Sequence, residues 1–349
     1  MAKVVLVTGV SRYLGGLLAR RLAAEPGVEH VVGVDVIPPP HDIGTVEFVR
    51  ADIRNPMISR VIESAEVDTV VHMNVIATPT FVGGRTPQKE INVIGTMQLL
   101  AACQKARTVK RLVVKSSAAV YGSTPRDPAM FTEDMGARHT PSGGFGKDSI
   151  EVEGYVRGFA RRRPDAEILM LRFANIIGPR IRTSITDYFN MPVVPVPLGY
   201  DARLQFVHED DAIEALTLAA TGHVTGVVNI AGDGVVTVLQ AAAIAGRPIL
   251  PVPLPAAGFV GGMTRRLRLA DFSPDQVSLL AFGRGLDTTR MREELGFEPR
   301  YTSREAFEDL AGTLGSAVPA ASAVSDVVSG VAGSASQALL RALGAGSGR

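Results

Sequence analysis

The chain has 349 residues, 46% of them apolar, and its 36 Lys and Arg side chains are nearly balanced by 35 Asp and Glu. This composition is typical of a globular protein with one large core or two joined cores, and it excludes a chain that is disordered throughout. The balanced charge excludes a broad basic field, so we expect neither nucleic acid nor a membrane surface as a partner.

A single cysteine, Cys103, excludes a disulfide framework and a thiolate metal cluster. No apolar run reaches the roughly 20 residues of a membrane span. We therefore expect a cytoplasmic protein without a metal site.

Short β-branched runs alternate with longer helical patterns through the first half of the chain. Buried Val/Ile/Leu runs separated by helices predict a parallel, doubly wound α/β sheet of the Rossmann type. The predicted strands are KVVLVT, HVVGVD, VEFVRAD, DTVVHM, RLVVKSS and EILMLRF, and the predicted helices cover residues 13–24, 55–64, 88–106 and 147–162.

The second half of the chain is punctuated by proline, in NMPVVPVPLGY and GRPILPVPLPAAGF. Such segments cannot be central strands or long helices, so we expect a smaller lobe. Between them, LQFVHEDDAIEALTLAA and GVVNIAGDG predict a strand, a helix with Asp210 or Asp211 as N-cap, and a further strand of the main domain. The expected division is a dinucleotide-binding domain (1–174 and 204–236), a substrate lobe (175–203 and 237–311) and a low-complexity tail (312–349).

The first predicted strand runs into a glycine-rich turn, VTGVSRYLGG. Thr8 and Gly9 end the strand and Gly15 opens the helix, which makes an anion site for a pyrophosphate. Asp35 ends the next strand, where a carboxylate binds the adenosine ribose and repels a 2′-phosphate. The pattern therefore favours NAD over NADP as the cofactor.

Seven further motifs give the chain a family resemblance over residues 2 to about 310. The chain resembles the extended short-chain dehydrogenases/reductases of the NAD-dependent epimerase/dehydratase family, and within it actinobacterial UDP-glucose 4-epimerase-like proteins. The motifs are ADIRNP, DTVVHMN, INVIGT, KSSAAVYG, LRFANIIGPR, FVHEDDA and LDTTRMREELGFEPR.

Transferred to matching positions, the resemblance implies a row of residues along bound NAD. Asp35 would bind the adenosine ribose, and Asn92 would support the nicotinamide half from behind. The others are Gly9, Tyr13, Leu14 and Gly15 at the pyrophosphate, Asp52 and Ile53 at the adenine, and Met73 and Asn74 near the centre of the cofactor.

Arg12 departs from the family pattern, which has glycine at this place. Glycine there lets the backbone approach the phosphates closely. Three alternatives stay open: Arg12 pairs with the pyrophosphate itself, it swings away into solvent, or it weakens cofactor binding.

The resemblance also implies a Ser, a Tyr and a Lys that act together in proton transfer. Ser117 matches the Ser, but Phe145 stands at the Tyr position and Ser149 at the Lys position. Lys147 does not replace the Lys, because two residues along a helix turn a side chain by about 200 degrees.

Other groups that could transfer a proton have ordinary structural explanations. They are Tyr121, His72, His139, Asp148 and His208. Ala118 and Ala119 follow Ser117 where sugar-nucleotide 4,6-dehydratases carry Asp and Glu, so dehydration is the least favoured chemistry.

The resemblance implies a nucleotide-sugar substrate. Asn175 would contact the substrate's phosphates, and Arg180 is an available cation nearby. A homodimer through the helices at 88–106 and 147–162 is also expected.

Two main hypotheses about function follow, and a third is that the fold binds no ligand. The chain is an NAD-dependent enzyme with a non-standard acid–base site, or it is a non-catalytic module that senses NAD or scaffolds a partner.

Overall fold

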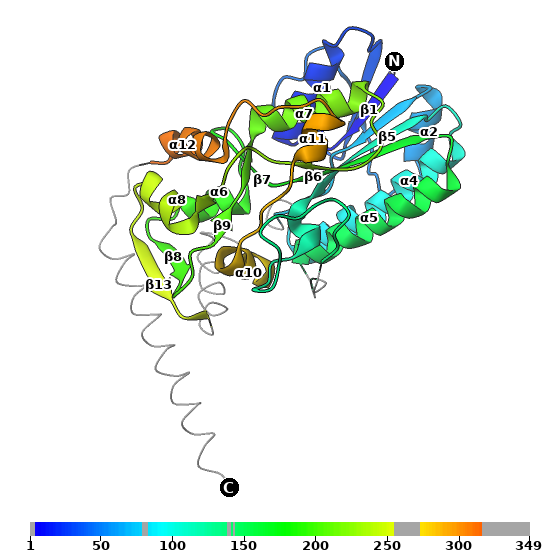
Figure 1. Ribbon diagram of the computed structural model, residues 1–349. Helices are drawn as coiled ribbons and strands as arrows, with labels where there is room; N and C mark the ends of the chain where they lie inside the picture. The colour runs from blue at the N-terminus through cyan, green and yellow to red at the C-terminus, as the bar shows by residue number, and fades with distance from the viewer. Residues whose placement is uncertain (1–3, 79–82, 138–140, 142–143, 255–272, 316–349) are drawn as a thin grey trace, which may run out of the picture.

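The computed structural model describes residues 4–78, 83–137, 141, 144–254 and 273–315 (Figure 1). The predicted tail lies outside the described residues from residue 316 onward.

A seven-stranded parallel sheet forms the centre of the larger part of the molecule (Figure 1). Its strand order is β11-β6-β5-β4-β1-β2-β3, so the chain winds outward in both directions from β1 and β4. This confirms the doubly wound α/β prediction, and all six predicted strands are present. The strands are β1 (Val4–Thr8), β2 (His30–Asp35), β3 (Glu47–Arg50), β4 (Thr69–His72), β5 (Arg111–Ser117), β6 (Glu167–Phe173) and β11 (Gly226–Ile230).

Helices cover both faces of this sheet. Helices α1, α7 and α11 pack on one face through a core that includes Leu18, Leu216 and Met291. Helices α2, α4 and α5 pack on the other, where Ile62 and Cys103 are buried. The bounds are α1 (Tyr13–Ala23), α2 (Ile58–Ser64), α4 (Thr96–Lys105), α5 (Gly144–Arg162), α7 (Glu209–Thr221) and α11 (Thr289–Glu293).

The helix predicted at 88–106 is three consecutive elements. A short helix α3 (Arg85–Lys89) leads into a π-helical turn η2 (Glu90–Gly95) and then into α4. A π-helical turn inside an α-helix is rare and occurs most often at functional sites. A short 3₁₀ helix η3 (Ala118–Tyr121) follows β5.

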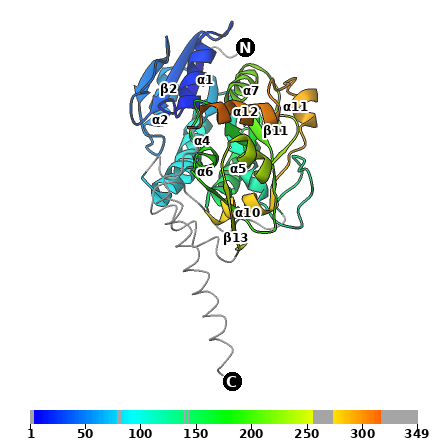
Figure 2. The ribbon, with the colours of Figure 1, turned by 90° about the vertical axis from the view of Figure 1, so that its left-hand side faces the viewer.

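A smaller lobe lies beside the sheet, with its own core around Phe189, Phe206 and Phe307 (Figures 1 and 2). The two proline-rich segments form β8 and β13, which pair in parallel with each other. The elements of this region are β7 (Asn175–Ile177), α6 (Ser184–Phe189), β8 (Val194–Pro197), β9 (Arg203–Leu204), β10 (Phe206–His208), β12 (Val236–Thr237), α8 (Val238–Ile244), β13 (Ile249–Val252), α10 (Pro274–Phe282) and α12 (Ser303–Thr313).

The division into two domains remains a proposal. Two features support it: α7 and β11 return to the large sheet after the first part of the lobe, and β8 pairs, among the described strands, with β13 alone. α11 lies within the expected lobe range by sequence but packs against β11.

The N-cap of α7 differs from the prediction. The helix begins at Glu209, and the cap is His208, two residues before Asp210, whose backbone N–H the His208 Nδ1 accepts at 3.1 Å. Asp210 and Asp211 lie in the first turn instead, where their charge favours the helix dipole.

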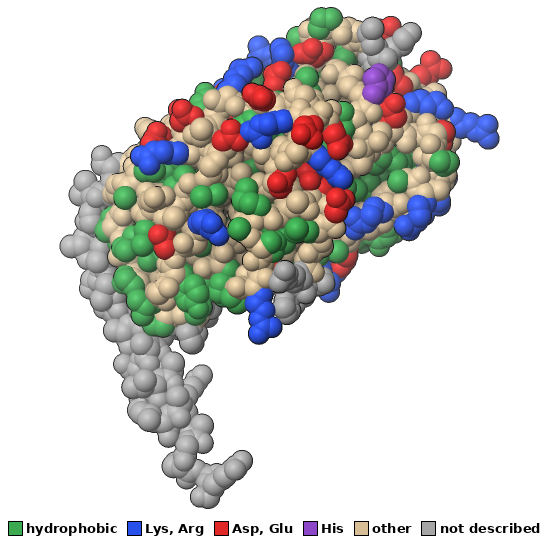
Figure 3. All heavy atoms as spheres, viewed as in Figure 1, with side chains coloured by type: hydrophobic (Ala, Val, Ile, Leu, Met, Phe, Trp, Pro, Cys, Tyr) green, Lys and Arg blue, Asp and Glu red, His purple; other side chains and the backbone are tan. Residues whose placement is uncertain are grey.

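Positive and negative side chains are interspersed on the face seen in Figure 3. Within the described ranges, no helix combines the length and the apolar character that crossing a bilayer requires.

Candidate functional site

A cleft of about 660 Å³ opens at the carboxyl edge of the seven-stranded sheet. Parallel sheets bind ligands at this edge, because the loops and helix starts converge there. The cleft is lined from one side by the β1–α1 turn and the ends of β2, β4 and β5, and from the other by α5, α6 and α10. All but two of the predicted site residues line it, and the two exceptions are Asn92 and Ser149.

The β1–α1 turn is tightly packed at its glycines. Gly9 has φ +80°, and a Cβ at Gly15 would lie 2.1 Å from the carbonyl oxygen of Gly9. No side chain larger than hydrogen fits at Gly15 without moving the turn. The start of α1 therefore presents its backbone to the cleft at close range, as a pyrophosphate site requires.

Arg12 lies at this turn with its side chain in the cleft wall. Burial lowers the pKa of its guanidinium, and the carboxylate of Asp35 opposes that shift. Arg12 therefore turns inward and does not swing away into solvent.

Asp35 is fixed by two backbone hydrogen bonds. Its carboxylate accepts the N–H of Ser11 at 3.0 Å and the N–H of Val36 at 2.7 Å. The side chain is 9% exposed and lines the cleft. This rigid acceptor fits the ribose hydroxyls of an adenosine.

Asp52 and Ile53 line the cleft beside Asp35. Arg54 forms a salt bridge with Asp52 at 2.7 Å, and its hydrogen bonds lower the pKa of that carboxyl. Ile53 is buried, and a Cβ at Gly95 would lie 2.7 Å from its Cδ1. Strand β3 and the η2 turn therefore fix this part of the wall.

Met73 and Asn74 follow β4 on the cleft wall. Asn92 lies behind them in the η2 turn, fully buried. Its amide accepts the N–H of Ile76 at 2.7 Å and donates to the carbonyl oxygen of Ile76 at 2.9 Å. Asn92 thus holds the segment after β4 in place and does not itself reach the cleft.

The residues at the three positions of the expected proton relay differ in their access to the cleft. Ser117 lines the cleft, and its hydroxyl accepts the N–H of Ala119 at 3.1 Å. Phe145 also lines the cleft and is half-buried. Ser149 is fully buried.

The other candidate proton-transfer groups are occupied elsewhere. Tyr121 is buried and donates to Asn229 at 2.8 Å, and Asp148 forms a salt bridge with Arg85 at 2.5 Å. His72 lies between Thr8 and Thr96, at 3.0 Å and 2.8 Å. His208 caps α7, and His139 lies outside the described residues.

Several charged residues in the cleft wall were not predicted from the sequence, among them Lys115, Asp275 and Arg284. Lys115 lies on β5 two residues before Ser117, and Asp275 and Arg284 come from the start and the far side of α10. A lysine at the end of an apolar strand was the one available signal. The sequence carries no comparable signal for Asp275 or Arg284.

Asp275 has a buried carboxylate oxygen, Oδ2, for which the described residues offer no hydrogen-bond partner. A Cβ at Gly144 would lie 2.5 Å from this oxygen, so Asp275 lies directly against the start of α5. Burial raises the pKa of its carboxyl group, although the N–H of Gly146 and two arginines oppose the shift.

Asn175 and Arg180, predicted at the substrate end, both line the cleft. Arg180 forms salt bridges with Glu209 at 2.7 Å and Asp210 at 2.5 Å, and its guanidinium lies 5.7 Å from the ring centroid of Tyr13. Its charge is therefore already balanced, and it lies near the β1–α1 turn. The role of Arg180 in substrate binding stays a prediction.

Known proteins resemble this chain in sequence and in fold. Residues 5–231 match the NAD dependent epimerase/dehydratase family. An uncharacterised protein of Mycobacterium tuberculosis is 49% identical over 313 residues, which cover 88% of this chain and 83% of that protein.

Two solved structures share the fold. UDP-glucose 4-epimerase from Thermotoga maritima, solved with UDP-glucose, has a TM-score of 0.69 at 22% identity, covering 89% of this chain and 98% of its own. MoeE5 in complex with UDP-glucose and NAD has a TM-score of 0.62 at 25% identity with the same coverage.

Proposed function

The chain belongs to the NAD-dependent epimerase/dehydratase family, and on that premise we propose that it binds NAD and acts on a nucleotide sugar through a non-standard acid–base site. One observation carries the proposal. A single cleft joins the predicted cofactor residues, from Gly9 to Asn74, to Asn175 at the substrate end, with Ser117 also in its wall.

The residues of the cleft fit NAD at several points. The β1–α1 turn has no space for a Cβ at Gly15, which suits a close phosphate, and Arg12 adds a cation there. Asp35 is held by two N–H groups, as a ribose acceptor. When bound, NAD would supply the hydride acceptor for oxidation of a hydroxyl group.

The far end of the cleft suits a polar ligand with hydroxyl groups. The free Oδ2 of Asp275 is an acceptor, and Asn175 and Ser184 add polar groups nearby. Similar proteins bind UDP-glucose, as the Thermotoga maritima epimerase and MoeE5 do. A nucleoside-diphosphate sugar is therefore the substrate class that we propose.

Phe145 and Ser149 make the acid–base site non-standard. A benzyl ring has no proton to transfer, and the Ser149 hydroxyl does not line the cleft. Loss of general acid–base catalysis costs on the order of 10² to 10⁴ in rate. A different group must supply this catalysis if the protein is an enzyme.

The same two residues favour a second candidate, a non-catalytic module that senses NAD or scaffolds a partner. In this form the cleft would bind NAD but transfer no hydride.

Nucleotides released from the purified full-length protein by denaturation test the proposal. We expect NAD at close to one molecule per chain. The native protein is then mixed with UDP-glucose and related nucleotide sugars, and formation of NADH is followed at its near-ultraviolet absorbance. Hydride transfer supports the enzyme, and bound NAD without transfer across the panel supports the non-catalytic module. Absence of NAD, with no binding when it is added, would refute both.

A further inference from the structure

Lys115 lies where the reacting end of a ligand is expected. On β5, Val114 pairs with His72, the last residue of β4, so Lys115 lies one residue beyond the end of that neighbouring strand. Ligands bind at this carboxyl edge of a parallel sheet. Lys115 is therefore unpaired on the β4 side, although it still pairs with Leu171 of β6 on the other, and it lines the cleft at this edge of the sheet.

Lys115 and Ser117 share one face of β5. Side chains alternate along a strand, and the intervening Ser116 points to the other face, where its hydroxyl donates to the buried Glu153 at 2.7 Å. Lys115 and Ser117 both line the cleft, separated by two residues, which is about 6.6 Å along a strand. One substrate molecule can therefore contact both side chains.

Within the described residues, the amine of Lys115 makes a single hydrogen bond. Its Nζ donates to the carbonyl oxygen of Val75 at 3.2 Å, in the segment that Asn92 fixes from behind. That carbonyl accepts a hydrogen bond from the amine whether or not the amine is charged. No carboxylate pairs with Lys115 within the described residues.

The charges around Lys115 are positive or absent. Arg12 acts on it from the start of α1, and His72, on the neighbouring strand β4, is buried and neutral because burial lowers the pKa of its imidazole to about 3. Burial, followed by repulsion from Arg12, lowers the pKa of Lys115 to about 8. A substantial share of neutral amine is then present near neutral pH, which an exposed lysine does not provide.

From this placement we infer that Lys115 is the proton-transfer group of the site, in place of the missing Tyr and Lys. The inference rests on the proposed function. The neutral Nζ takes the proton of a substrate hydroxyl and becomes an ammonium, while the carbon–oxygen single bond becomes a carbonyl. The C–H electron pair leaves as hydride, for which NAD⁺ is the acceptor, and in the reverse direction the ammonium returns the proton.

Competitive labelling tests the amine without any need for turnover. The full-length protein is acetylated with trace acetic anhydride from pH 6 to pH 11, and each lysine is quantified by peptide mass spectrometry. We expect Lys115 to titrate near pH 8, and the exposed Lys110 and Lys147 serve as internal references in the same samples. Added NAD should protect Lys115 and leave Lys147 unprotected.

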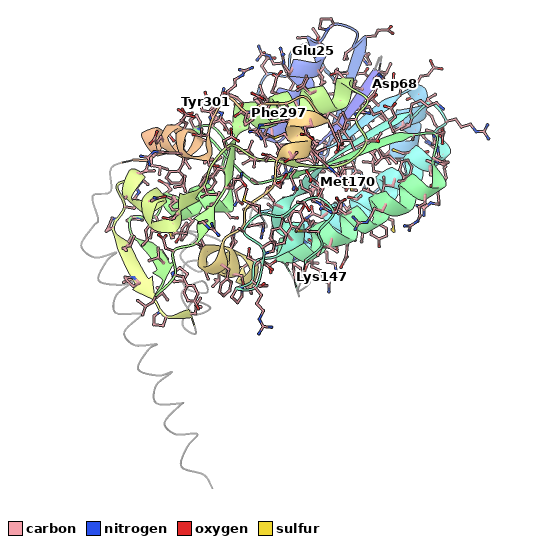
Figure 4. The ribbon with its side chains drawn as sticks, in the orientation of Figure 1. Glu25, Asp68, Lys147, Met170, Phe297 and Tyr301 are labelled. Atoms are coloured by element: carbon pink, nitrogen blue, oxygen red, sulfur yellow. The ribbon has the colours of Figure 1, made fainter. Side chains whose placement is uncertain are left out.

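Three variants separate a base from a simple cation. Lys115→Met should lower hydride transfer by 10² to 10⁴ without loss of bound NAD. Lys115→Arg keeps the charge but cannot lose its proton, so we expect kcat to fall as in Lys115→Met while the KM for the nucleotide sugar stays close to wild type. Lys147→Met, on the exposed side of α5 (Figure 4), should behave as wild type.

The outcomes distinguish the two proposals. If the protein binds NAD and transfers hydride but Lys115 titrates with the other lysines, only the proposed role of Lys115 is overturned. The same holds if the Lys115→Met variant keeps full kcat. Protein that binds NAD without hydride transfer overturns the enzyme, and with it the role of Lys115. Failure to bind NAD overturns the proposed function itself.

Discussion

Ser149 donates its side-chain hydroxyl to the carbonyl oxygen of Phe145, 2.9 Å away, one turn earlier in α5. The two residues that stand at the Tyr and Lys positions are therefore joined to each other through the helix. Neither side chain offers a titrating group to the cleft, and α5 continues without a break through both residues.

Restoring both groups should raise hydride transfer. Because the start of α5 already lines the cleft, Phe145→Tyr with Ser149→Lys places a phenol and an amine at the inherited positions. We expect an increase of up to 10² to 10⁴ in the rate of NADH formation. Phe145→Tyr alone is the control and should give a smaller gain. No gain in protein that still holds NAD would contradict the alignment of Phe145 and Ser149 with the family's Tyr and Lys.

Gly15→Ala should abolish NAD binding and destabilise the fold. The added Cβ would lie 2.1 Å from the carbonyl oxygen of Gly9, so the β1–α1 turn must open. Overpacking of this kind costs about 1–3 kcal/mol in the free energy of unfolding, which urea titration measures. Gly154→Ala, in α5 with open space around it, is the matched control and should stabilise the protein by about 0.5–1 kcal/mol. Equal behaviour of the two variants would show that the turn is not tight.

Arg12→Gly should weaken NAD binding, although it restores the family's usual residue. Charge-assisted hydrogen bonds contribute about 1.5–3 kcal/mol, which corresponds to a roughly tenfold to hundredfold loss of affinity. Titration calorimetry at two salt concentrations measures the affinity and its salt dependence, which should both fall. The same variant should raise the pKa of Lys115, because Arg12 contributes to lowering it. Tighter binding by the glycine variant would indicate that Arg12 obstructs the cofactor.

Glu153→Ala should cost about 3–5 kcal/mol, because it leaves the buried Arg172 without its partner at 2.7 Å. Glu308→Ala removes an exposed ion pair with Arg304 and is the control, with an expected cost of at most about 1 kcal/mol. Urea unfolding at pH 7 compares the two.

The Glu153 contribution should also depend on pH. Burial would raise the pKa of this carboxyl, but hydrogen bonds and the charge of Arg172 outweigh burial and lower it. A lowered folded-state pKa means that the stabilisation is fully present above the unfolded value of about 4.3 and is lost as pH falls through the folded value. The stability difference between wild type and Glu153→Ala should therefore shrink below pH 4. A difference that stays constant down to pH 3 would exclude this linkage.

The expected homodimer can be tested at the surface of η2 and α4, which contain Ile94 and Met97 respectively. Ile94 and Met97 are 43% and 41% exposed and lie three residues apart, so they share a helix face, and Tyr155 on α5 is 40% exposed. Light scattering should give twice the chain mass for wild type and the monomer mass for Ile94→Glu. Ile249→Glu, equally exposed on β13, should leave the dimer intact. A monomeric wild type would refute the expectation.

Most of the fold could be predicted from the sequence because its signals are local. Buried β-branched runs identified six strands of the large sheet, and helical spacing identified the helices between them. The π-helical turn around Asn92 was missed, since the side chain of Asn92 forms its hydrogen bonds with Ile76, which lies 16 residues earlier in the chain.

The candidate site was only partly predictable, because the direction of a side chain depends on the elements packed around it. The glycine turn and Asp35 follow from strand ends and were predicted. Lys115 was not predicted as a site residue, since a lysine at a strand end is usually solvated. Asp275 reaches the start of α5 from a helix 130 residues later, and no local pattern indicates such a contact.

The position of Arg284 has a consequence for how the protein is made. Its guanidinium donates to the carbonyl oxygen of Gly122 at 2.7 Å and to the hydroxyl of Ser123 at 3.1 Å, next to the loop that follows β5. During synthesis the large sheet is complete once Ile230 has emerged, whereas Asp275 and Arg284 follow much later. Domains fold in order from the N-terminus on the ribosome. The nascent chain therefore acquires its sheet, α5 and α6 before α10 completes the second wall of the cleft, so a ligand can stabilise the protein through Asp275 or Arg284 only after the C-terminal part has docked.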